Sequence, residues 1–196
     1  MDTVPTPSQT VGPFFHVNLT TVENCVRCIA GPQAKGERVW LSCRLLDGAG
    51  EAVPDAMIEI WQADAEGRYY AAGAVHDGAV LKSEDDPGWR GFGRLATDQD
   101  GSCEFETIRP GRVPGPGGVL QAPHLEVALF ARGMLKQLFT RIYFAADPAN
   151  REDPVLQLVP EDRRETLMAF PDGVLAGKWL FDIHLQGEEE TVFFEV

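Results

Sequence analysis

The segment QAPHLEVALFARG, residues 121–133, places His124 and Glu126 two positions apart in an apolar run. Strand side chains alternate between two faces, so these two would be neighbours, with Arg132 farther along the same row. Together with a second histidine and open positions, such a pair is typical of non-haem iron sites. The spacing alone leaves two interpretations open, a metal site or a hydrogen-bonded histidine in a β-protein, and it favours the second.

Other potential ligands in the sequence do not complete a metal site. Cys25 and Cys28 have the spacing of half a zinc site or of a redox pair, but no second pair accompanies them. We expect reduced thiols, because the N-terminus has no signal-peptide pattern and a cytoplasmic location follows. Three further histidines occur without an HxH or HExxH motif: His16, His76 and His184.

Arg132 is a second kind of candidate. It ends an apolar segment and is followed by Gly133, so an exposed strand end is the simplest explanation. A planar guanidinium at that place can also bind a carboxylate through two parallel hydrogen bonds. The serines lack a GxSxG context and no phosphate-binding glycine loop is present, so nucleophilic and nucleotide chemistry are disfavoured.

Composition restricts the possible partners. The 196 residues carry a formal charge of −13, with 44% hydrophobic and 24% charged residues. This balance predicts one globular domain, and its negative field disfavours nucleic acid and anionic membranes. No apolar run of about 18 residues exists, so no membrane-spanning helix is expected.

The order of segments predicts an all-β protein, a mainly antiparallel β-sandwich. Residues 1–38 contain scattered prolines and are expected to form an N-terminal arm that packs on a partner chain, with the sandwich domain at 39–196. One short helix is predicted at 160–170, and a hairpin is predicted around Asp100-Gly101. Alternating or apolar segments predict strands at 39–47, 56–64, 102–108, 124–132, 138–144, 177–186 and 191–196.

Five segments together resemble the intradiol ring-cleaving dioxygenase family. They follow the family's order and cover most of the chain: PSQTVGPFFH (7–16), IEIWQADAEGRY (58–69), GFGRLATDQDGSCEFETIRPG (91–111), QAPHLEVALFARG (121–133) and TRIYFAADPAN (140–150). The resemblance implies the β-sandwich fold and O2-dependent cleavage of an aromatic ring. Iron-bearing members of the family hold Fe(III) with two tyrosinates and two histidines.

The sequence departs from the family pattern at the positions that bind iron. Val113 stands where a tyrosine follows the Pro-Gly turn, Glu126 stands at the second histidine, and Gln121 replaces an arginine before the histidine pair. Only His124 matches a ligand. Ferric iron prefers anionic oxygen donors, so the resemblance implies that this chain binds no metal and that His124 and Glu126 occupy degenerate ligand positions.

These departures resemble the family's iron-free chains, which pair with a homologous iron-bearing chain. The implied activity of the pair is cleavage of 3,4-dihydroxybenzoate to 3-carboxy-cis,cis-muconate, with Fe(III) on the partner and a higher hetero-oligomer expected. The resemblance implies that this chain contributes substrate-binding residues and no catalytic residue of its own. Carried over by position, these residues are Thr10, Gly12, Pro13 and Arg132.

Two other functions stay open at this stage. A self-sufficient metal oxygenase would use His124, Glu126 and a third ligand, and the missing tyrosines argue against it. A non-catalytic β-sandwich could instead bind only a protein or a small ligand. The near-complete family pattern at 7–16 and 121–150 argues against this second alternative.

Overall fold

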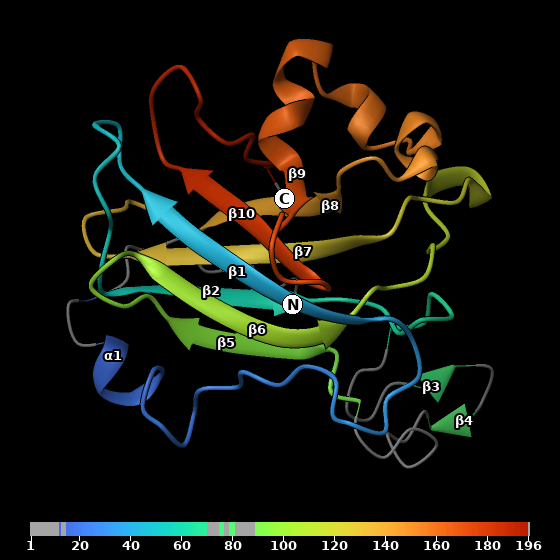
Figure 1. Cartoon of the computed structure of the whole chain (residues 1–196), viewed down its shortest axis with the longest axis horizontal. Coiled ribbons are helices and arrows are strands. Elements are labelled where there is room, and N and C mark those ends of the chain that lie inside the picture. The colour runs from blue at the N-terminus through green and yellow to red at the C-terminus, as the bar shows by residue number, and fades with distance from the viewer. Residues whose placement is uncertain (1–11, 13–14, 70–74, 77–78, 81–88, 196) are drawn as a thin grey trace, which may run out of the picture.

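The computed structural model describes residues 12, 15–69, 75–76, 79–80 and 89–195. Eight strands form one sheet in the order β5–β2–β7–β8–β9–β10–β1–β6, which folds over into two layers, so that β1 and β10 cross in front of β2 and β7 (Figure 1). Most pairings are antiparallel, and the predicted antiparallel β-sandwich is confirmed. The strands are β1 Arg38–Leu46, β2 Ala56–Trp61, β5 Phe92–Ala96, β6 Ser102–Ile108, β7 His124–Ala131, β8 Leu138–Phe144, β9 Met168–Pro171 and β10 Lys178–His184.

The remaining described elements are short. A separate two-stranded sheet joins β3 (Val75–His76) to β4 (Ala79–Val80). Helical turns are α1 Phe15–Asn18, η2 Pro116–Gly118, η3 Pro148–Glu152, η4 Leu156–Leu158 and η5 Glu161–Leu167. Among the described residues, no helix has the length and apolar character needed to cross a membrane.

The core lies between the two layers. Alternate residues of β1, such as Leu41 and Leu45, are fully buried and belong to the same cluster as Ile58 and Ile60 of β2. Each such side chain contributes about 1.5–3 kcal/mol on burial. In β7, the residues that alternate with the core-facing ones point away from the core, and they include His124 and Glu126.

A segment of the predicted arm closes the sheet. The backbone of Val26 pairs with Arg94 of β5, with N···O distances of 2.7 and 2.9 Å, and Ile29 N donates to Glu106 O of β6 at 2.9 Å. Ile29 and Ala30 are fully buried. Residues 26–30 thus pack on this chain's own edge strands, and contact with a partner stays a prediction for the residues before them.

Three sequence-based expectations differ from the structure. The predicted hairpin around Asp100-Gly101 is wrong, because its strands separate and join opposite ends of the sheet, β5 next to β2 and β6 next to β1. The helix predicted at 160–170 is a 3-10 helix, η5, followed directly by β9. Among its described residues, 191–195, the final predicted strand makes only an isolated bridge, between Phe139 and Phe194.

Candidate functional site

The His124–Glu126 row lies on the outer face of the layer that contains β7. The ladder to β8 aligns His124 with Tyr143 and Glu126 with Arg141. Cross-strand partners on one face lie within contact distance, so the four side chains form one cluster. The two neighbours expected from the sequence do meet, with His124 Nε2 3.3 Å from Glu126 Oε1.

His124 is only 3% exposed and both of its ring nitrogens face oxygen acceptors. Nδ1 lies 2.7 Å from the carbonyl oxygen of Ala122, and Nε2 faces the carboxylate of Glu126. A ring nitrogen that carries a proton can donate it to the oxygen that it faces. In this arrangement the imidazole acts as a hydrogen-bond donor.

Arg141 is the centre of the cluster. Its guanidinium lies 2.7 Å from Glu126 Oε1 through Nη2 and donates to Gln121 Oε1 at 2.7 Å through Nη1. The Nη1 atom also lies 3.4 Å from the hydroxyl of Tyr143. A cation therefore already neutralises the carboxylate of Glu126.

Asp153 connects this cluster to the loop beyond β8. Its fully buried carboxylate accepts from the Tyr143 hydroxyl at 3.2 Å and from the backbone N–H of Ala122 at 2.7 Å. It also accepts from the N–H groups of Val155 and Leu156. Buried polar groups are costly unless they are paired, and here each has a partner within the chain.

Burial and neighbouring charges shift the pKa values of Glu126, Tyr143 and the nearby Tyr69. Burial opposes ionisation of Glu126, but the His124 hydrogen bond and the charge of Arg141 outweigh it and lower the pKa of the carboxyl. Burial, together with the negative charge of Glu126, raises the pKa of Tyr69 to about 12. Burial likewise raises the pKa of Tyr143. Both phenols are therefore neutral at physiological pH.

Arg132 stands apart from the cluster, just beyond the end of β7. Its guanidinium lies 2.7 Å from Asp55 Oδ2 and its side chain is 58% exposed. Eight residues along a strand separate Arg132 from His124, roughly 26 Å at 3.3 Å per residue. The two sites suggested by one sequence segment therefore lie at opposite ends of β7. Gly12 is exposed, whereas Thr10 and Pro13 lie outside the described residues.

A groove of about 640 Å³ follows the same outer face. Its lining includes the charged Arg141 and Glu126 and the aromatic Phe130 and Phe139. Trp61 also lines it and packs on Phe92, with ring centroids 4.4 Å apart. Glu126, in the row that begins at His124, thus lines this groove.

Comparison with known proteins identifies the family. The family model described as "Dioxygenase" matches residues 10–187. The chain is 41% identical to the protocatechuate 3,4-dioxygenase alpha chain of Burkholderia cepacia over 97% of both chains. The chain belongs to the intradiol dioxygenase family.

Two further similar proteins are more distant. The protocatechuate 3,4-dioxygenase beta chain of Burkholderia cepacia is 33% identical, over 94% of this chain and 77% of its own length. The dioxygenase domain of a carbohydrate-binding fusion protein from Streptomyces sp. SirexAA-E has a TM-score of 0.62 at 24% identity, covering 94% of this chain and 99% of that domain. This structural likeness confirms the fold.

Measured against the ligand pattern that the resemblance implies, three described residues, Val113, His124 and Glu126, do not fit ferric iron. Val113, at the tyrosine position, is 4% exposed and offers no oxygen from its side chain. Glu126 is bound by Arg141, and the ring of His124 is engaged at both nitrogens. A metal ion here would meet a guanidinium beside the carboxylate, and like charges repel.

Sequence reasoning missed Arg141 and Asp153. Arg141 lies in the segment TRIYF, which the family resemblance includes, and nothing within that segment shows that its side chain is largely buried against a neighbouring strand. Its place follows only from the register of β7 on β8, where Arg141 faces Glu126. A charge pair on two strands predicted to be neighbours is the signal that could have found it.

Proposed function

We propose that this chain is the iron-free subunit of a two-chain protocatechuate 3,4-dioxygenase. With an iron-bearing homologue it cleaves 3,4-dihydroxybenzoate between its two hydroxylated carbons, giving 3-carboxy-cis,cis-muconate. The observation that carries this proposal is the ion pair between Arg141 and Glu126. Glu126 stands at an expected metal-ligand position, and the guanidinium of Arg141 neutralises its carboxylate there. The 41% identity to a protein named as an alpha chain supports the same role.

The redox chemistry belongs to ferric iron on the partner chain. Two features of this chain support that division: an apolar Val113 at the tyrosine position, and two phenols, Tyr69 and Tyr143, whose pKa values are raised by their surroundings. Iron-tyrosinate sites need anionic oxygen donors. The cluster around His124 then stabilises the fold of this chain through the hydrogen bonds of Asp153 and Arg141.

Arg132 is the residue through which this chain would bind the substrate. Its exposed guanidinium is oriented by Asp55, and a planar guanidinium has donors left for a second carboxylate. Because the chain carries a net charge of −13, an anionic substrate needs such a local cation. Thr10, Gly12 and Pro13 would line the same pocket at the interface.

The test is co-expression of this chain with its iron-bearing homologue, against each chain alone. Ring cleavage is followed by the loss of 3,4-dihydroxybenzoate absorbance. We expect full activity from the pair and none from this chain alone. Equal activity of the homologue with and without this chain would overturn the proposal, as would ring cleavage by this chain alone.

A further inference from the structure

Two cysteines face each other across the ladder between β1 and β6. Cys43 of β1 is the register partner of Cys103 of β6. Directly opposed residues of an antiparallel pair point to the same face of the sheet, so their side chains are neighbours. Cys43 is fully buried in the core, and Cys103 is partly buried and packs against the same core. The chain thus holds two free thiols side by side inside the fold.

The hydrogen bonds of the ladder determine how far apart these two residues lie. Two positions along the same register, Leu45 N donates to Gly101 O at 2.9 Å. Hydrogen-bonded pairs recur at every second residue of an antiparallel ladder, so Cys43 and Cys103 form such a pair, with Cα atoms about 5.5 Å apart. Disulfides span Cα distances of about 4.4–6.8 Å. The spacing of the two strands therefore suits a disulfide between these residues.

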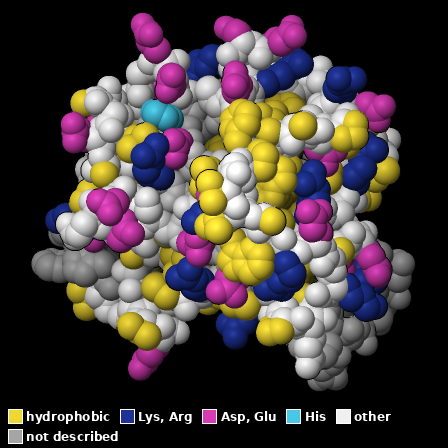
Figure 2. Space-filling model, in the orientation of Figure 1, with side chains coloured by type: hydrophobic (Ala, Val, Ile, Leu, Met, Phe, Trp, Pro, Cys, Tyr) yellow, Lys and Arg dark blue, Asp and Glu magenta, His cyan; other side chains and the backbone are white. Residues whose placement is uncertain are grey.

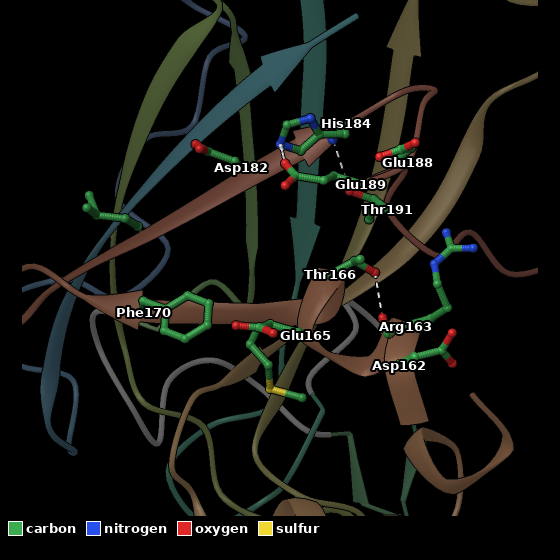
Figure 3. A pocket seen from close by; sticks show the side chains of 12 residues that line it. Asp162, Arg163, Glu165, Thr166, Phe170, Asp182, His184, Glu188, Glu189 and Thr191 are labelled. Atoms are coloured by element: carbon green, nitrogen blue, oxygen red, sulfur yellow. Dashed lines mark hydrogen bonds and ion pairs between the residues drawn. The ribbon is translucent and has the colours of Figure 1, made fainter. Parts of the chain in front are cut away.

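The Cys43 side chain points away from the outer surface of its layer. Figure 2 shows that surface, where apolar side chains gather over β9, β10 and β1 with charged groups around them. On β10, Asp182 lines a groove of about 520 Å³ at this surface (Figure 3). The preceding residue, Phe181, is buried and is the register partner of Cys43. Because neighbouring residues of a strand alternate faces, Cys43 and Phe181 both face the core.

The two thiols differ in how they react. A hydrogen bond with Cys103, together with burial, raises the pKa of the Cys43 thiol, so Cys43 stays protonated. The thiolate is the form of a cysteine that attacks an oxidant. The partly buried Cys103 is therefore the thiol that reacts first with a dissolved oxidant, and Cys43 lies beside it as the second.

A small oxidant reaches Cys103 from the end of the sheet. β6 is the last strand in the sheet order. In the described part of the chain, the segment 26–30 makes its backbone hydrogen bonds to β6 at Glu106, three residues beyond Cys103. The partial exposure of Cys103 agrees with this position. Access for a molecule as small as a peroxide then needs no opening of the core.

The other two cysteines are not arranged in this way. The Cys25 thiol donates to Thr20 O at 3.5 Å, and the Cys28 thiol donates to Ala30 O at 3.3 Å. The backbone that joins them bridges to two different strands, β5 at Val26 and β6 at Cys28. Their side chains are therefore not held opposite each other, although their sequence spacing is that of a redox pair.

We propose that Cys43 and Cys103 are a redox site that hydrogen peroxide converts into a cross-strand disulfide. The Cys103 thiolate attacks one peroxide oxygen and the O–O bond breaks. Cys103 becomes a sulfenic acid, and the other oxygen takes up the thiol proton and leaves as water. The sulfur of Cys43 then attacks the sulfur of Cys103, the S–O bond breaks, and the hydroxyl leaves with the Cys43 proton as a second water. Two thiols are oxidised to one disulfide, and the peroxide is reduced to two water molecules.

The disulfide has two effects on the chain. It joins β1 to β6, which are far apart in the sequence, and such a link stabilises the folded state by constraining the unfolded one. It also stops the oxidation of Cys103 at a reversible stage, because a sulfenic acid without a neighbouring thiol is open to irreversible oxidation. Neither effect rests on the proposed function.

The experiment treats the folded full-length chain with hydrogen peroxide, alkylates the remaining thiols in denaturant and identifies linked peptides by mass spectrometry. We expect the peptides that contain Cys43 and Cys103 to be joined, with a mass lower by two hydrogens, and to separate on reduction by a dithiol. Cys25→Ser/Cys28→Ser is the matched control and should give the same link. Cys103→Ser should give none.

Urea unfolding of the same samples measures the effect on stability. Oxidation should raise the urea midpoint of the wild type, a dithiol should reverse the shift, and Cys103→Ser should show no shift. In the urea-unfolded chain, peroxide should link the four cysteines without preference for this pair, because the ladder no longer aligns them. The wild-type mass spectra decide the main point whether or not a variant folds.

Several results would overturn this proposal. They are four unmodified thiols after peroxide treatment, links through Cys25 or Cys28 in place of this pair, and Cys103 oxidised to a sulfinic acid beside an unmodified Cys43. Equally selective linking of Cys43 to Cys103 in the unfolded chain would also overturn it, since the fold would not be the cause. A disulfide that leaves the urea midpoint unchanged would contradict its stabilising role.

Discussion

The guanidinium of Arg141 lies 2.7 Å from the carboxylate of Glu126, across the ladder between β8 and β7. This contact places a permanent positive charge beside Glu126, the residue that the family resemblance aligns with a metal-ligand position. A guanidinium stays protonated at any physiological pH. Within the cluster around His124, Arg141 therefore supplies the positive charge that neutralises Glu126.

Removing that cation should destabilise the fold. In Arg141→Met, Glu126 and Gln121 each lose a donor, and the expected cost is about 1–3 kcal/mol of unfolding free energy because Glu126 remains partly exposed to water. The double variant Arg141→Met/Glu126→Leu should recover part of the loss, since no unpaired charge remains. Urea unfolding of the four proteins in this cycle measures the coupling. Additive effects would show that the pair contributes nothing.

The same pair predicts an acid sensitivity. Glu126 has a lowered pKa in the folded chain, so its contribution to stability is fully present above the ordinary glutamate pKa of about 4.3 and is lost as the pH falls through the lowered value. The difference in unfolding free energy between wild type and Glu126→Gln should be constant above about pH 5 and shrink below about pH 4. Denaturation at several pH values checks this, and a difference that grows on acidification contradicts it.

Arg132 should affect substrate capture rather than stability. In the assembled enzyme, Arg132→Ala is expected to cost about 1.5–3 kcal/mol in substrate binding, seen as a raised KM with a smaller change in kcat. Asp55→Asn keeps the backbone conformation, because Asn tolerates the φ of 62° at that position, but it removes the charge that orients Arg132, so we expect it to raise KM by less than Arg132→Ala does. Kinetic constants of Arg132→Ala equal to those of the wild type would exclude the assignment.

The segment that closes the sheet should behave as part of the core. Ile29 is fully buried between the edge strands, so Ile29→Ala is expected to lower the unfolding free energy by about 2–5 kcal/mol. Val22→Ala, at a side chain that is 95% exposed in the same N-terminal region, serves as the control and should change little. Equal stability of the two variants would place residues 26–30 outside the folded domain.

Structural features that depend on residues close together in the sequence were predicted from local patterns. The alternation of Leu41, Cys43 and Leu45 placed a strand with one buried face, and the spacing of His124 and Glu126 placed them together. Strand pairing depends on distant segments, so the hairpin around Asp100 was predicted wrongly although its turn residues are typical of one.

The cluster shows the same limit. The sequence marked His124 and Glu126 but not Arg141, because the contact that determines their chemistry crosses from β7 to β8. The arm was likewise assigned by its prolines, whereas backbone pairing with β5 and β6 includes residues 26–30 in the sheet. In both places a non-local hydrogen bond outweighs the local pattern.

The central claim is that this chain contributes to an iron enzyme without holding the iron. The most direct test is to purify the chain alone from iron-supplemented cells and to measure bound iron and visible absorption. We expect far less than one iron per chain and no tyrosinate-to-iron band, with both signals present when the homologue is co-expressed. Stoichiometric iron and colour in this chain alone would contradict the account.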